Sequence, residues 1–356
     1  MTETNIWKDV LILGRNQKNE GDIELVWTGS GVEFDMNASE LGLEFESGNS
    51  IYMSWISVVL DGEWLAHIPV QEGNSRIMLF RGMDSSVTHR VRIIKDTQAS
   101  VDDPGSFLIL KKLIYEGEVH KPSPKKYKLE FVGDSITSGE GALGAHEEMD
   151  WITPYFSSVR NYAVMTSDSL DAEFRIVSQS GWGVTTGWDN NPTSTLPLIY
   201  DSTFAKRDVK DYDHSSWVPD AVIINLGTND GGAFDNPTFT DPSTGKTYKY
   251  NKLPDGRYDP ADLEKIKNGM VSFLKHLREC HPQAHLLWVY GMLGSPMMDT
   301  IETAVSQFWT ENDDNAGYLL LPDTNGEAFG SRGHPGLLSH RAASEKIAER
   351  LKTVLK

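Results

Sequence analysis

The sequence changes its repeat pattern near residue 120, and this change constrains the fold more than any other feature. Before that point apolar and polar residues alternate with period two, as in Val32-Glu-Phe-Asp-Met-Asn37. Beyond it, strand-like apolar runs alternate with segments of helical spacing. A chain of 356 residues is long enough for two such regions, each with its own core. The pattern therefore predicts two domains, 1–118 and 127–356, joined by a proline-containing linker over 119–126.

The first region has the features of an antiparallel β-sandwich. Its predicted strands are short and closely spaced, and Asp61-Gly62 between two apolar runs is a strong hairpin signal. Glycine, asparagine and aspartate separate the strands, and no segment has convincing helical spacing. We therefore expect a jelly-roll-like β-sandwich.

The second region predicts a mostly parallel sheet covered by helices. Strands are expected at 129–132, 174–178, 220–226, 285–290 and 318–321, and helices at 154–170, 260–280, 300–311 and 339–352. Strands that alternate with helices favour right-handed crossovers and a three-layer α/β/α domain. Residues 234–258 form a long insertion without clear periodicity, which is typical of a lid or a binding loop.

Charge and composition narrow the class of partner. The formal net charge of −18 disfavours nucleic acid and anionic membrane surfaces, and the single cysteine, Cys280, excludes an intramolecular disulfide. The N-terminus lacks a signal-peptide pattern, and no apolar stretch reaches the ~20 residues that span a bilayer. The sequence predicts a cytoplasmic protein with no membrane partner, although a chain trimmed of its leader would look the same. The sequence does not determine the oligomeric state, and a homo-oligomer is one of the alternatives.

Gly133-Asp134-Ser135 follows the first predicted strand of the second region. Ligand and catalytic sites of open α/β sheets gather at the carboxyl ends of the strands, so Ser135 stands where a nucleophile would be useful. The same tripeptide is also ordinary turn chemistry. By itself it does not distinguish a catalytic serine from a turn.

Three further stretches come just after predicted strands. They are Ser178-Gln-Ser-Gly-Trp-Gly-Val184, Asn225-Leu-Gly-Thr-Asn-Asp230 and Ser331-Arg-Gly-His-Pro335. Each alone has a structural explanation as a turn or a helix cap. Together they place Gly181, Asn229 and His334 at the same edge of the sheet as Ser135.

Ester hydrolysis requires this set of groups. A serine attacks the acyl carbon while a neighbouring imidazole takes its proton, which suits Ser135 and His334. The tetrahedral intermediate needs donors for its oxyanion, and the N–H groups of Ser135 and Gly181 with the Asn229 amide supply three. The sequence predicts this serine–histidine site.

These four blocks, in this order, resemble the SGNH hydrolases, also called GDSL esterases. Preceded by a β-sandwich, the whole chain most resembles the carbohydrate esterase family 2 deacetylases, which join a jelly roll to an SGNH domain. The resemblance implies removal of O-acetyl groups from carbohydrates such as xylan or its oligosaccharides. It implies neither a metal nor an organic cofactor.

One position departs from the SGNH pattern. Many members carry an aspartate three residues before the histidine, where this chain has Ser331. The neighbouring acids Asp323 and Glu327 lack the motif spacing. We therefore predict a Ser135–His334 dyad, with a backbone carbonyl holding the other ring nitrogen and Asp323 as the alternative third member.

Several other side chains have both a functional and a structural interpretation. Trp182 and Trp188 are predicted to stack on a sugar, Trp188 preferentially, although they could instead cover a small core. Asp134 and Asp230 are expected to brace their loops. Weaker candidates for substrate contact lie in the insertion: Phe239, Tyr248 and Tyr250. A histidine- and cysteine-rich segment is interpreted as a solvated helix terminus rather than a metal site; it contains His276, Cys280, His281 and His285.

Two alternative functions remain. An SGNH lipase or thioesterase would use the same residues on a longer acyl group, and would need an apolar acyl groove. A non-catalytic carbohydrate-binding protein would hold glycan without releasing acetate.

Overall fold

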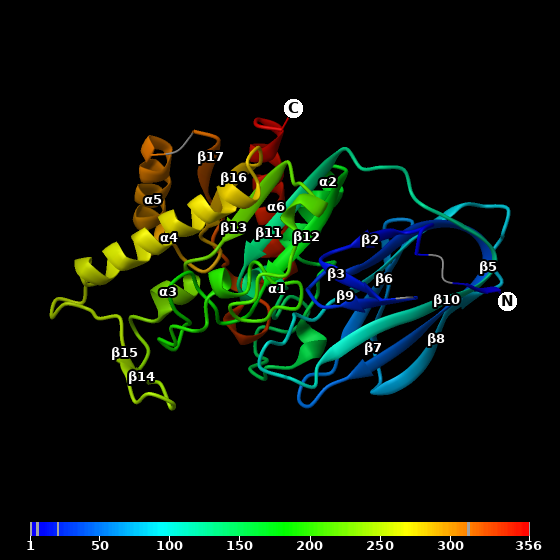
Figure 1. Cartoon of the computed structure of the whole chain (residues 1–356), viewed down its shortest axis with the longest axis horizontal. Helices are drawn as coiled ribbons and strands as arrows, with labels where there is room; N and C mark the ends of the chain where they lie inside the picture. Colours follow the sequence, from blue (N-terminus) through cyan, green and yellow to red (C-terminus); the bar gives the residue numbers. More distant parts are fainter. Residues whose placement is uncertain (1, 5–6, 20, 312–313, 356) are drawn as a thin grey trace.

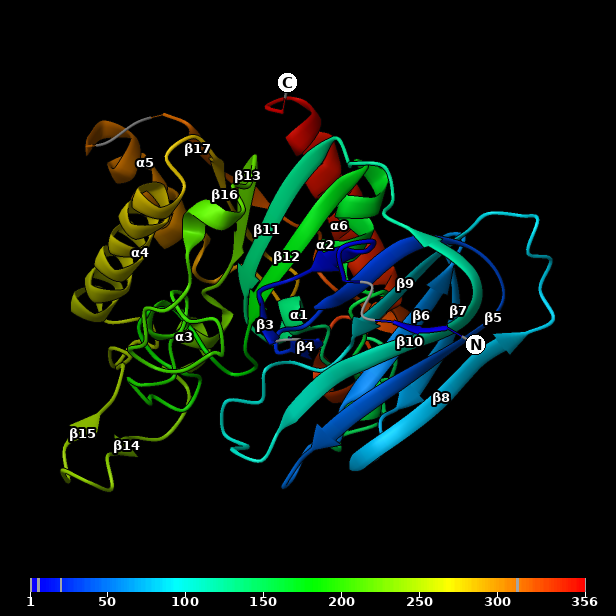
Figure 2. The ribbon, with the colours of Figure 1, turned by 45° about the vertical axis from the view of Figure 1, so that its right-hand side comes forward.

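The computed structural model describes residues 2–4, 7–19, 21–311 and 314–355, and comprises an antiparallel β domain followed by an α/β domain (Figure 1). The strands of the β domain are β1 (Thr2–Thr4), β2 (Leu11–Leu13), β3 (Asn16–Asn19), β4 (Asp22–Leu25), β5 (Gly31–Gly48), β6 (Trp55–Leu60), β7 (Glu63–Pro69), β8 (Gly73–Arg81), β9 (His89–Lys95) and β10 (Phe107–His120). They hydrogen-bond into one ten-stranded sheet that bends around its apolar side (Figure 2). The predicted antiparallel β domain is confirmed, while its jelly-roll topology stays a prediction.

Strand β5 organises the β domain. It pairs with β10 along most of its length, with β9 through its first half and with β8 through its second half. Its buried side chains stand at alternate positions: Val32, Phe34, Met36, Ala38, then Leu41, Leu43, Phe45. The parity changes at Ser39, because Ala38 pairs with Gly117 and Glu40 with Glu116, which leaves Ser39 as a bulge.

The predicted hairpin at Asp61-Gly62 is present. Leu60 of β6 pairs with Glu63 of β7, so these two residues alone form the turn. Both have positive φ, 52° and 88°, as the twist of a two-residue hairpin requires.

The second domain is a five-stranded parallel sheet between two layers of helices, as predicted. The strands are β11 (Tyr127–Gly133), β12 (Ala172–Ser178), β13 (Ala221–Asn225), β16 (His285–Tyr290) and β17 (Ala316–Leu320), in the spatial order β12-β11-β13-β16-β17. The helices are α1 (Ser135–Ser138), α2 (Tyr162–Ser169), α3 (Thr228–Gly232), α4 (Pro260–Cys280), α5 (Met298–Glu311) and α6 (Leu337–Lys352), with 3-10 turns at Thr153–Tyr155, Leu196–Leu198, His214–Ser216, Gly326–Ala328 and Ser331–Gly333.

Alternate residues of the buried strands face opposite helix layers. Phe131 and Ile223 pack with α2 and α6, whereas Val132 and Ile224 pack with α4 and α5. The layers lie on the two sides of the sheet in Figure 1. Strands buried on both faces explain the continuous apolar runs of the sequence.

The helix predicted over 154–170 is shorter than expected. Only Tyr162–Ser169 is α-helical, with Asn161 as its N-cap. Residues 156–161 are instead drawn into contact with other segments: Ser157 N donates to Gly139 O at 3.1 Å, and Ser158 N donates to Asp96 of the β domain at 2.7 Å. These tertiary hydrogen bonds replace the helical ones. The insertion at 234–258 contains one small hairpin, β14 (Phe239–Thr240) with β15 (Thr247–Tyr248).

Charged side chains join the two domains through one buried and one partly buried contact. Arg15 reaches from the β domain to Glu130 on β11, with an N–O distance of 3.0 Å and side-chain exposures of 0% and 1%. Arg92 on β9 makes a bidentate pair with Asp168 on α2, at 2.8 and 3.1 Å. Residues 121–126 connect β10 to β11. Among the described residues, no helix combines the length and apolarity that crossing a membrane requires.

Candidate active site

Three neighbouring strands end in register at the edge of the parallel sheet. Gly133 of β11 pairs with Ser178 of β12 on one side and with Asn225 of β13 on the other. The segments that follow these strands, together with the loop before α6, line a cavity of about 320 Å³. Its lining residues are Ser135, Glu140, Trp151, Ser180, Gly181, Trp188, Asn229, Arg332 and His334. The structure thus brings together Ser135, Gly181, Asn229, His334 and Trp188 of the predicted site.

Ser135 and His334 face each other in this cavity. The distance from Ser135 Oγ to His334 Nε2 is 2.9 Å, and His334 Nδ1 lies 3.2 Å from the carbonyl oxygen of Arg332. A proton on Nδ1 therefore donates to that carbonyl and leaves Nε2 to accept from the serine hydroxyl. This is the arrangement that the predicted dyad requires.

The loop before α6 holds the histidine through local backbone geometry. Arg332 has a φ of 57°, which turns the chain sharply between Ser331 and His334. Gly330 N donates to His334 O at 2.8 Å, and Ser331 N donates to Gly141 O at 3.1 Å. A Cβ on Gly141 would lie 2.6 Å from the Ser331 carbonyl, so glycine is needed where the serine loop meets the histidine loop.

Neither neighbouring acid occupies the orienting position beside Nδ1. Asp323 accepts from Gly294 N at 2.9 Å, and no hydrogen bond joins it to His334 within the described part of the chain. Glu140, which the sequence interpretation missed, has Oε1 3.7 Å from His334 Nε2 and 3.3 Å from Arg332 Nε. It therefore lies on the serine side of the ring. Its place five residues after Ser135 was the available signal.

The three residues predicted to donate to the oxyanion line the same cavity as the serine hydroxyl. Ser135 is the first residue of α1, so its N–H has no intrahelical acceptor. Gly181 has a φ of 79°, and a Cβ there would lie 2.9 Å from Trp188 Cδ1. The Asn229 amide donates to Trp182 O at 3.0 Å and to Asp134 Oδ2 at 3.2 Å, which fixes its orientation at the cavity wall.

Two buried acids brace these loops, as expected. Asp134 caps α1 by accepting from Ile136 N at 3.0 Å, and burial raises its pKa to about 7, with the charges of Asp230 and Glu140 adding to the shift. Asp230 accepts from the backbone N–H groups of Val184 and Thr185, both at 2.8 Å. Burial also raises the pKa of Asp230.

The two tryptophans of the predicted platform lie in different environments. Trp188 is 52% exposed and lines the cavity. Trp182 is 3% exposed, packs in the core on the α4 side and carries Arg207 over its ring, which favours the structural alternative for this residue. Trp151 also lines the cavity, with its ring 4.4 Å from that of Tyr52. Its position in a polar loop was the signal that could have identified it.

The aromatic residues of the insertion do not line this cavity. Phe239 and Tyr248 pair across the β14–β15 hairpin, and the Tyr250 hydroxyl donates to Thr185 Oγ1 at 2.9 Å. Tyr250 therefore supports the segment that Asp230 also braces.

The β domain contributes directly to the site through Gln98. Its Oε1 accepts from Ser180 N at 2.8 Å and from Ser138 Oγ at 3.2 Å. Ser180 precedes the predicted oxyanion glycine, and Ser138 belongs to the helix that begins with Ser135. One side chain of the first domain thus links both loops.

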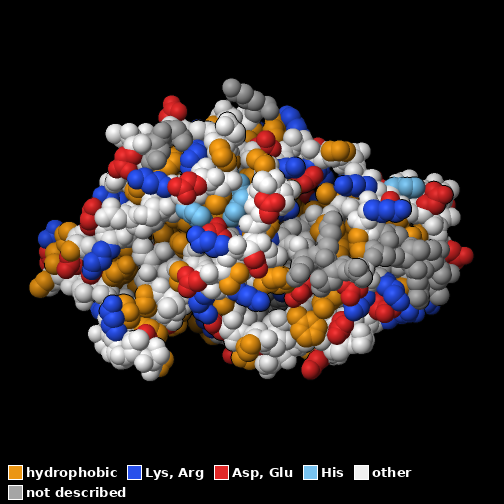
Figure 3. Space-filling view, in the orientation of Figure 1, with side chains coloured by type: hydrophobic (Ala, Val, Ile, Leu, Met, Phe, Trp, Pro, Cys, Tyr) orange, Lys and Arg blue, Asp and Glu red, His pale blue; other side chains and the backbone are white. Residues whose placement is uncertain are grey.

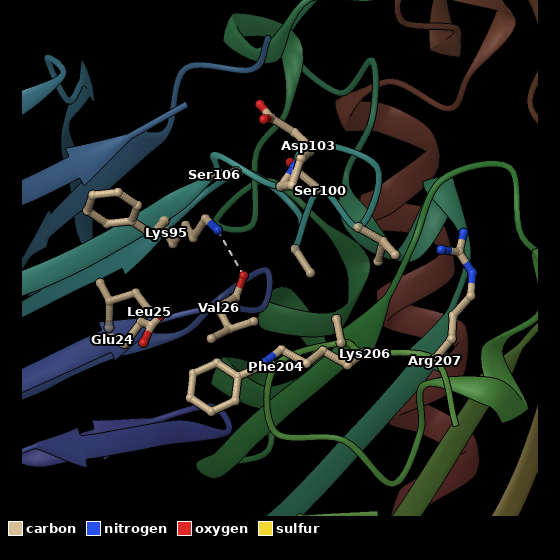
Figure 4. Close-up of a pocket in the computed structure, with 15 residues that line it drawn as sticks. Glu24, Leu25, Val26, Lys95, Ser100, Asp103, Ser106, Phe204, Lys206 and Arg207 are labelled. Atoms are coloured by element: carbon tan, nitrogen blue, oxygen red, sulfur yellow. Dashed lines mark hydrogen bonds between the residues drawn. The ribbon is translucent and has the colours of Figure 1, made fainter. Parts of the chain in front are cut away.

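A larger cavity, of about 570 Å³, lies where the two domains meet (Figure 4). Lys95 is buried there and donates to Val26 O at 2.8 Å, and burial lowers its pKa to about 8. This cavity contains none of the predicted catalytic residues.

Acidic and basic side chains are interspersed over the face of the molecule shown in Figure 3.

The histidine- and cysteine-rich segment is not the solvated helix terminus that was expected, because His281 and His285 are 1% and 7% exposed. It divides into two groups. His281 contacts Glu130 at 3.3 Å, and His285 Nδ1 contacts Asn315 at 3.0 Å. Although burial by itself raises it, the charge of Arg15 and the contact with His281 hold the pKa of Glu130 well below its usual range. His276 and Cys280 lie close to Asp201, away from the cavity of Ser135.

Comparisons with known proteins agree with this architecture. Residues 12–122 match the model of the carbohydrate esterase 2 N-terminal family. Cellulase/esterase CelE of Acetivibrio thermocellus is 26% identical over 92% of this chain, and the chain spans 37% of the length of that relative. An acetylxylan esterase/glucomannan deacetylase of Cellvibrio japonicus is 24% identical over 97% of this chain and 89% of the relative.

One solved structure matches nearly the whole chain. The acetyl xylan esterase Est2A of the rumen bacterium Butyrivibrio proteoclasticus is 37% identical, with a TM-score of 0.96 over 99% of this chain and 98% of that one. A family two carbohydrate esterase of Clostridium thermocellum, solved with cellohexaose, has the same fold at a TM-score of 0.83 and 24% identity, over 97% of this chain and 99% of that one. Identity and coverage at this level, with the matching N-terminal family, establish that the protein belongs to carbohydrate esterase family 2.

Proposed function

We propose that this protein is a serine esterase that removes O-acetyl groups from carbohydrates through an acyl-enzyme. The observation that carries the proposal is the 2.9 Å contact between Ser135 Oγ and His334 Nε2, inside a cavity that Gly181 and Asn229 also line. A nucleophile, a base and oxyanion donors around one empty space are the requirements of acyl transfer.

In the first half of the reaction, Ser135 Oγ attacks the acetyl carbon and its proton passes to His334 Nε2. The Arg332 carbonyl, 3.2 Å from Nδ1, stabilises the resulting imidazolium. The oxyanion receives hydrogen bonds from the N–H groups of Ser135 and Gly181 and from the Asn229 amide, which gives up its longer bond, 3.2 Å, to Asp134 Oδ2. Collapse of the intermediate expels the sugar oxygen, which takes the proton from His334.

In the second half, water hydrolyses the acetyl-serine. His334 Nε2 takes a proton from the water as it attacks, and returns it to Ser135 Oγ when acetate leaves. The same donors hold the second oxyanion. Both halves use residues of this chain alone.

The cavity favours a short acyl group on a sugar. Its volume of about 320 Å³ is at the small end of ligand pockets, and its lining includes Glu140, Arg332 and Asn229. The rings of Trp188 and Trp151 provide apolar faces on which a pyranose can stack. The names of the relatives, acetylxylan esterase and glucomannan deacetylase, support an acetylated polysaccharide or oligosaccharide as substrate.

Two alternatives use the same geometry differently. A lipase or thioesterase would need an apolar acyl groove, which the polar lining around Ser135 does not favour. A carbohydrate-binding protein would not need the serine–histidine hydrogen bond. Both remain outcomes of the test.

The test is acetate release from acetylated xylo-oligosaccharides by the wild type, by Ser135→Ala and by the control Ser86→Ala, whose serine is exposed in the β domain. We expect turnover by the wild type and the control, and a loss of at least about 10³-fold in Ser135→Ala. Retained turnover in Ser135→Ala would refute the serine mechanism. A preference for long acyl esters would select the lipase, and glycan binding without acetate release would select the binding protein.

A further inference from the structure

Four side chains with metal-ligating atoms converge near the end of α4. His276 and Cys280 stand four positions apart, on one face of the helix. Asp201 follows the 3-10 turn at Leu196–Leu198, and His214 begins the turn at His214–Ser216. The contacts are 2.8 Å from His276 Nε2 to Asp201 Oδ1, 3.1 Å from His214 Nε2 to the same oxygen, and 3.7 Å from Cys280 Sγ to His276 Nε2.

The separations between these atoms match a metal-binding arrangement. One atom each of Asp201, His276 and Cys280 lies within 4.8 Å of the other two. His214 contacts Asp201 but is not a member of this close group, so its ring has to move inward to serve as a fourth ligand. Tetrahedral Zn²⁺ with bonds of about 2.0–2.3 Å places its ligand atoms roughly 3.3–3.7 Å apart. Opening the Asp201–His276 contact by about 0.5 Å makes room for an ion among Asp201, His276 and Cys280, and an inward movement of the His214 ring supplies the fourth ligand. A thiolate with two imidazoles and a carboxylate is a donor set that selects zinc over magnesium or calcium.

We propose that Asp201, His214, His276 and Cys280 form a structural Zn²⁺ site. The four donors come from three separate segments, and neighbouring rings hold His214 in place: Tyr200 stacks on it at 5.2 Å, and Tyr212 meets it edge-on at 4.9 Å. The side chains of Asp201, His214 and His276 are 13%, 15% and 30% exposed, so the site is shielded but not closed off. A cavity of about 390 Å³ lined by Asp201, His276 and Leu198 provides a path from solvent.

The position of the cluster indicates a structural role. α4 ends at Cys280, shortly before β16 begins at His285, so the cluster lies toward the amino ends of the strands. Ser135 follows the carboxyl end of β11. Once His214 has moved in, four protein ligands leave no open coordination position for a substrate. The metal would fasten the irregular connection between β12 and β13, which contains two 3-10 turns and no α-helix, to the end of α4.

The competing explanation is a metal-free ion pair between Asp201 and protonated histidines. It accounts for the two short contacts to Asp201. It gives no role to Cys280, whose Sγ lies 3.7 Å from the same nitrogen that contacts Asp201. A measurement on the thiol therefore separates the two explanations.

The experiment uses the whole two-domain chain, equilibrated with Zn²⁺ and dialysed, and measures bound zinc by mass spectrometry. We expect about one zinc per chain in the wild type and in the control His120→Gln, whose side chain is 56% exposed and outside the cluster. Cys280→Ser and His276→Gln should weaken binding by more than the roughly 10–100-fold that loss of an outer-shell partner costs. Circular dichroism verifies that each variant is folded, and Asp201→Asn replaces any variant that is not.

A spectroscopic measurement provides a second readout that does not depend on activity. Because Cys280 is the single cysteine, a thiolate-to-cobalt charge-transfer band after replacement of zinc by Co²⁺ can arise from this residue alone. We expect the band in the wild type, its loss in Cys280→Ser, and a chelator-induced fall in Tm that the variant lacks. A wild type that holds no more zinc than Cys280→Ser, or that shows no charge-transfer band with Co²⁺, would overturn the proposal.

Discussion

The two ends of the parallel sheet both bring histidine together with acidic and nucleophilic side chains, and the arrangements differ. At the carboxyl ends, His334 faces one hydroxyl at 2.9 Å and a carbonyl at 3.2 Å, and Gly181 and Asn229 line the remaining space. At the amino ends, Asp201 Oδ1 receives two histidine nitrogens and Cys280 lies beside one of them. The first arrangement leaves a cavity for a substrate, whereas the second holds its donor atoms in contact and would open to admit an ion. Residue types alone therefore do not assign a function to such a cluster. The contacts that its side chains make, and the space left beside them, are also needed.

The largest expected effect separates the two ends. His334→Ala removes the only base that contacts Ser135 among the described residues, so kcat should fall by about 10⁴–10⁶-fold. His120→Ala, at an exposed residue that does not line the cavity, is the matched control. Acetate release under saturating substrate measures both. An equal loss in folded His276→Gln would show that the two ends are not independent.

Removal of one oxyanion donor should have a smaller effect. Asn229→Ala deletes an amide at the cavity wall, and we expect kcat to fall by about 10²–10³-fold with little change in KM. The exposed Asn251→Ala is the control. Steady-state kinetics on an acetyl ester provide the measurement; a change confined to KM would assign Asn229 to ground-state binding.

A buried histidine behind the catalytic loop should make the fold sensitive to acid. His340 accepts from Tyr162 N at 3.2 Å, and burial lowers its pKa to about 3, with His334 adding to the shift. The folded pKa lies below the unfolded value of about 6.5, so this stability is present above pH 6.5 and is lost as pH falls toward 3.

His340→Gln removes this titration. Between pH 7 and pH 5, its free energy of unfolding should fall by about 2 kcal/mol less than that of the wild type, which corresponds to roughly 30-fold in the unfolding equilibrium. Urea titrations at the two pH values measure the difference. If the free energy of unfolding falls equally in both proteins between pH 7 and pH 5, His340 is not a neutral buried histidine.

The smallest effect concerns the support that the β domain gives to the site. Gln98→Ala removes the acceptor for Ser180 N and Ser138 Oγ, so we expect kcat to fall roughly 10-fold through misplacement of the two loops. KM for a small aryl acetate should change less than kcat. Gln71→Ala, at an exposed position of the same domain, is the control, and unaltered kcat in Gln98→Ala would make the contact purely structural.

The sequence identified the sheet edge because each motif directly follows a strand. The strands containing Val132, Ile176 and Ile224 are buried on both faces, so their apolar runs were visible, and register then placed Ser135, Gly181 and Asn229 together. The carbonyl partner of His334 was expected because Ser331 stands where an aspartate is common.

Other features depend on tertiary contacts that leave no periodic signal. Trp182 and Trp188 share one loop, and only packing decides which of them is exposed. Asp201 and His214 lie in irregular chain, far in sequence from Cys280, so their convergence with α4 had no local pattern. The helix expected from residue 154 begins at Tyr162, because Asp96 and Gly139 bind the preceding segment.

The Arg15–Glu130 pair bears on how small a part of this chain can fold and function when it is transferred to another protein. Both side chains are buried, and they belong to different domains. Excising the α/β domain alone would remove Arg15 from Glu130 and uncover the apolar surface against which Leu13, Trp27 and Ile94 of the β domain are buried. The smallest portable unit is therefore the two-domain chain. The relative CelE, of which this chain spans 37%, carries its counterpart within a longer protein.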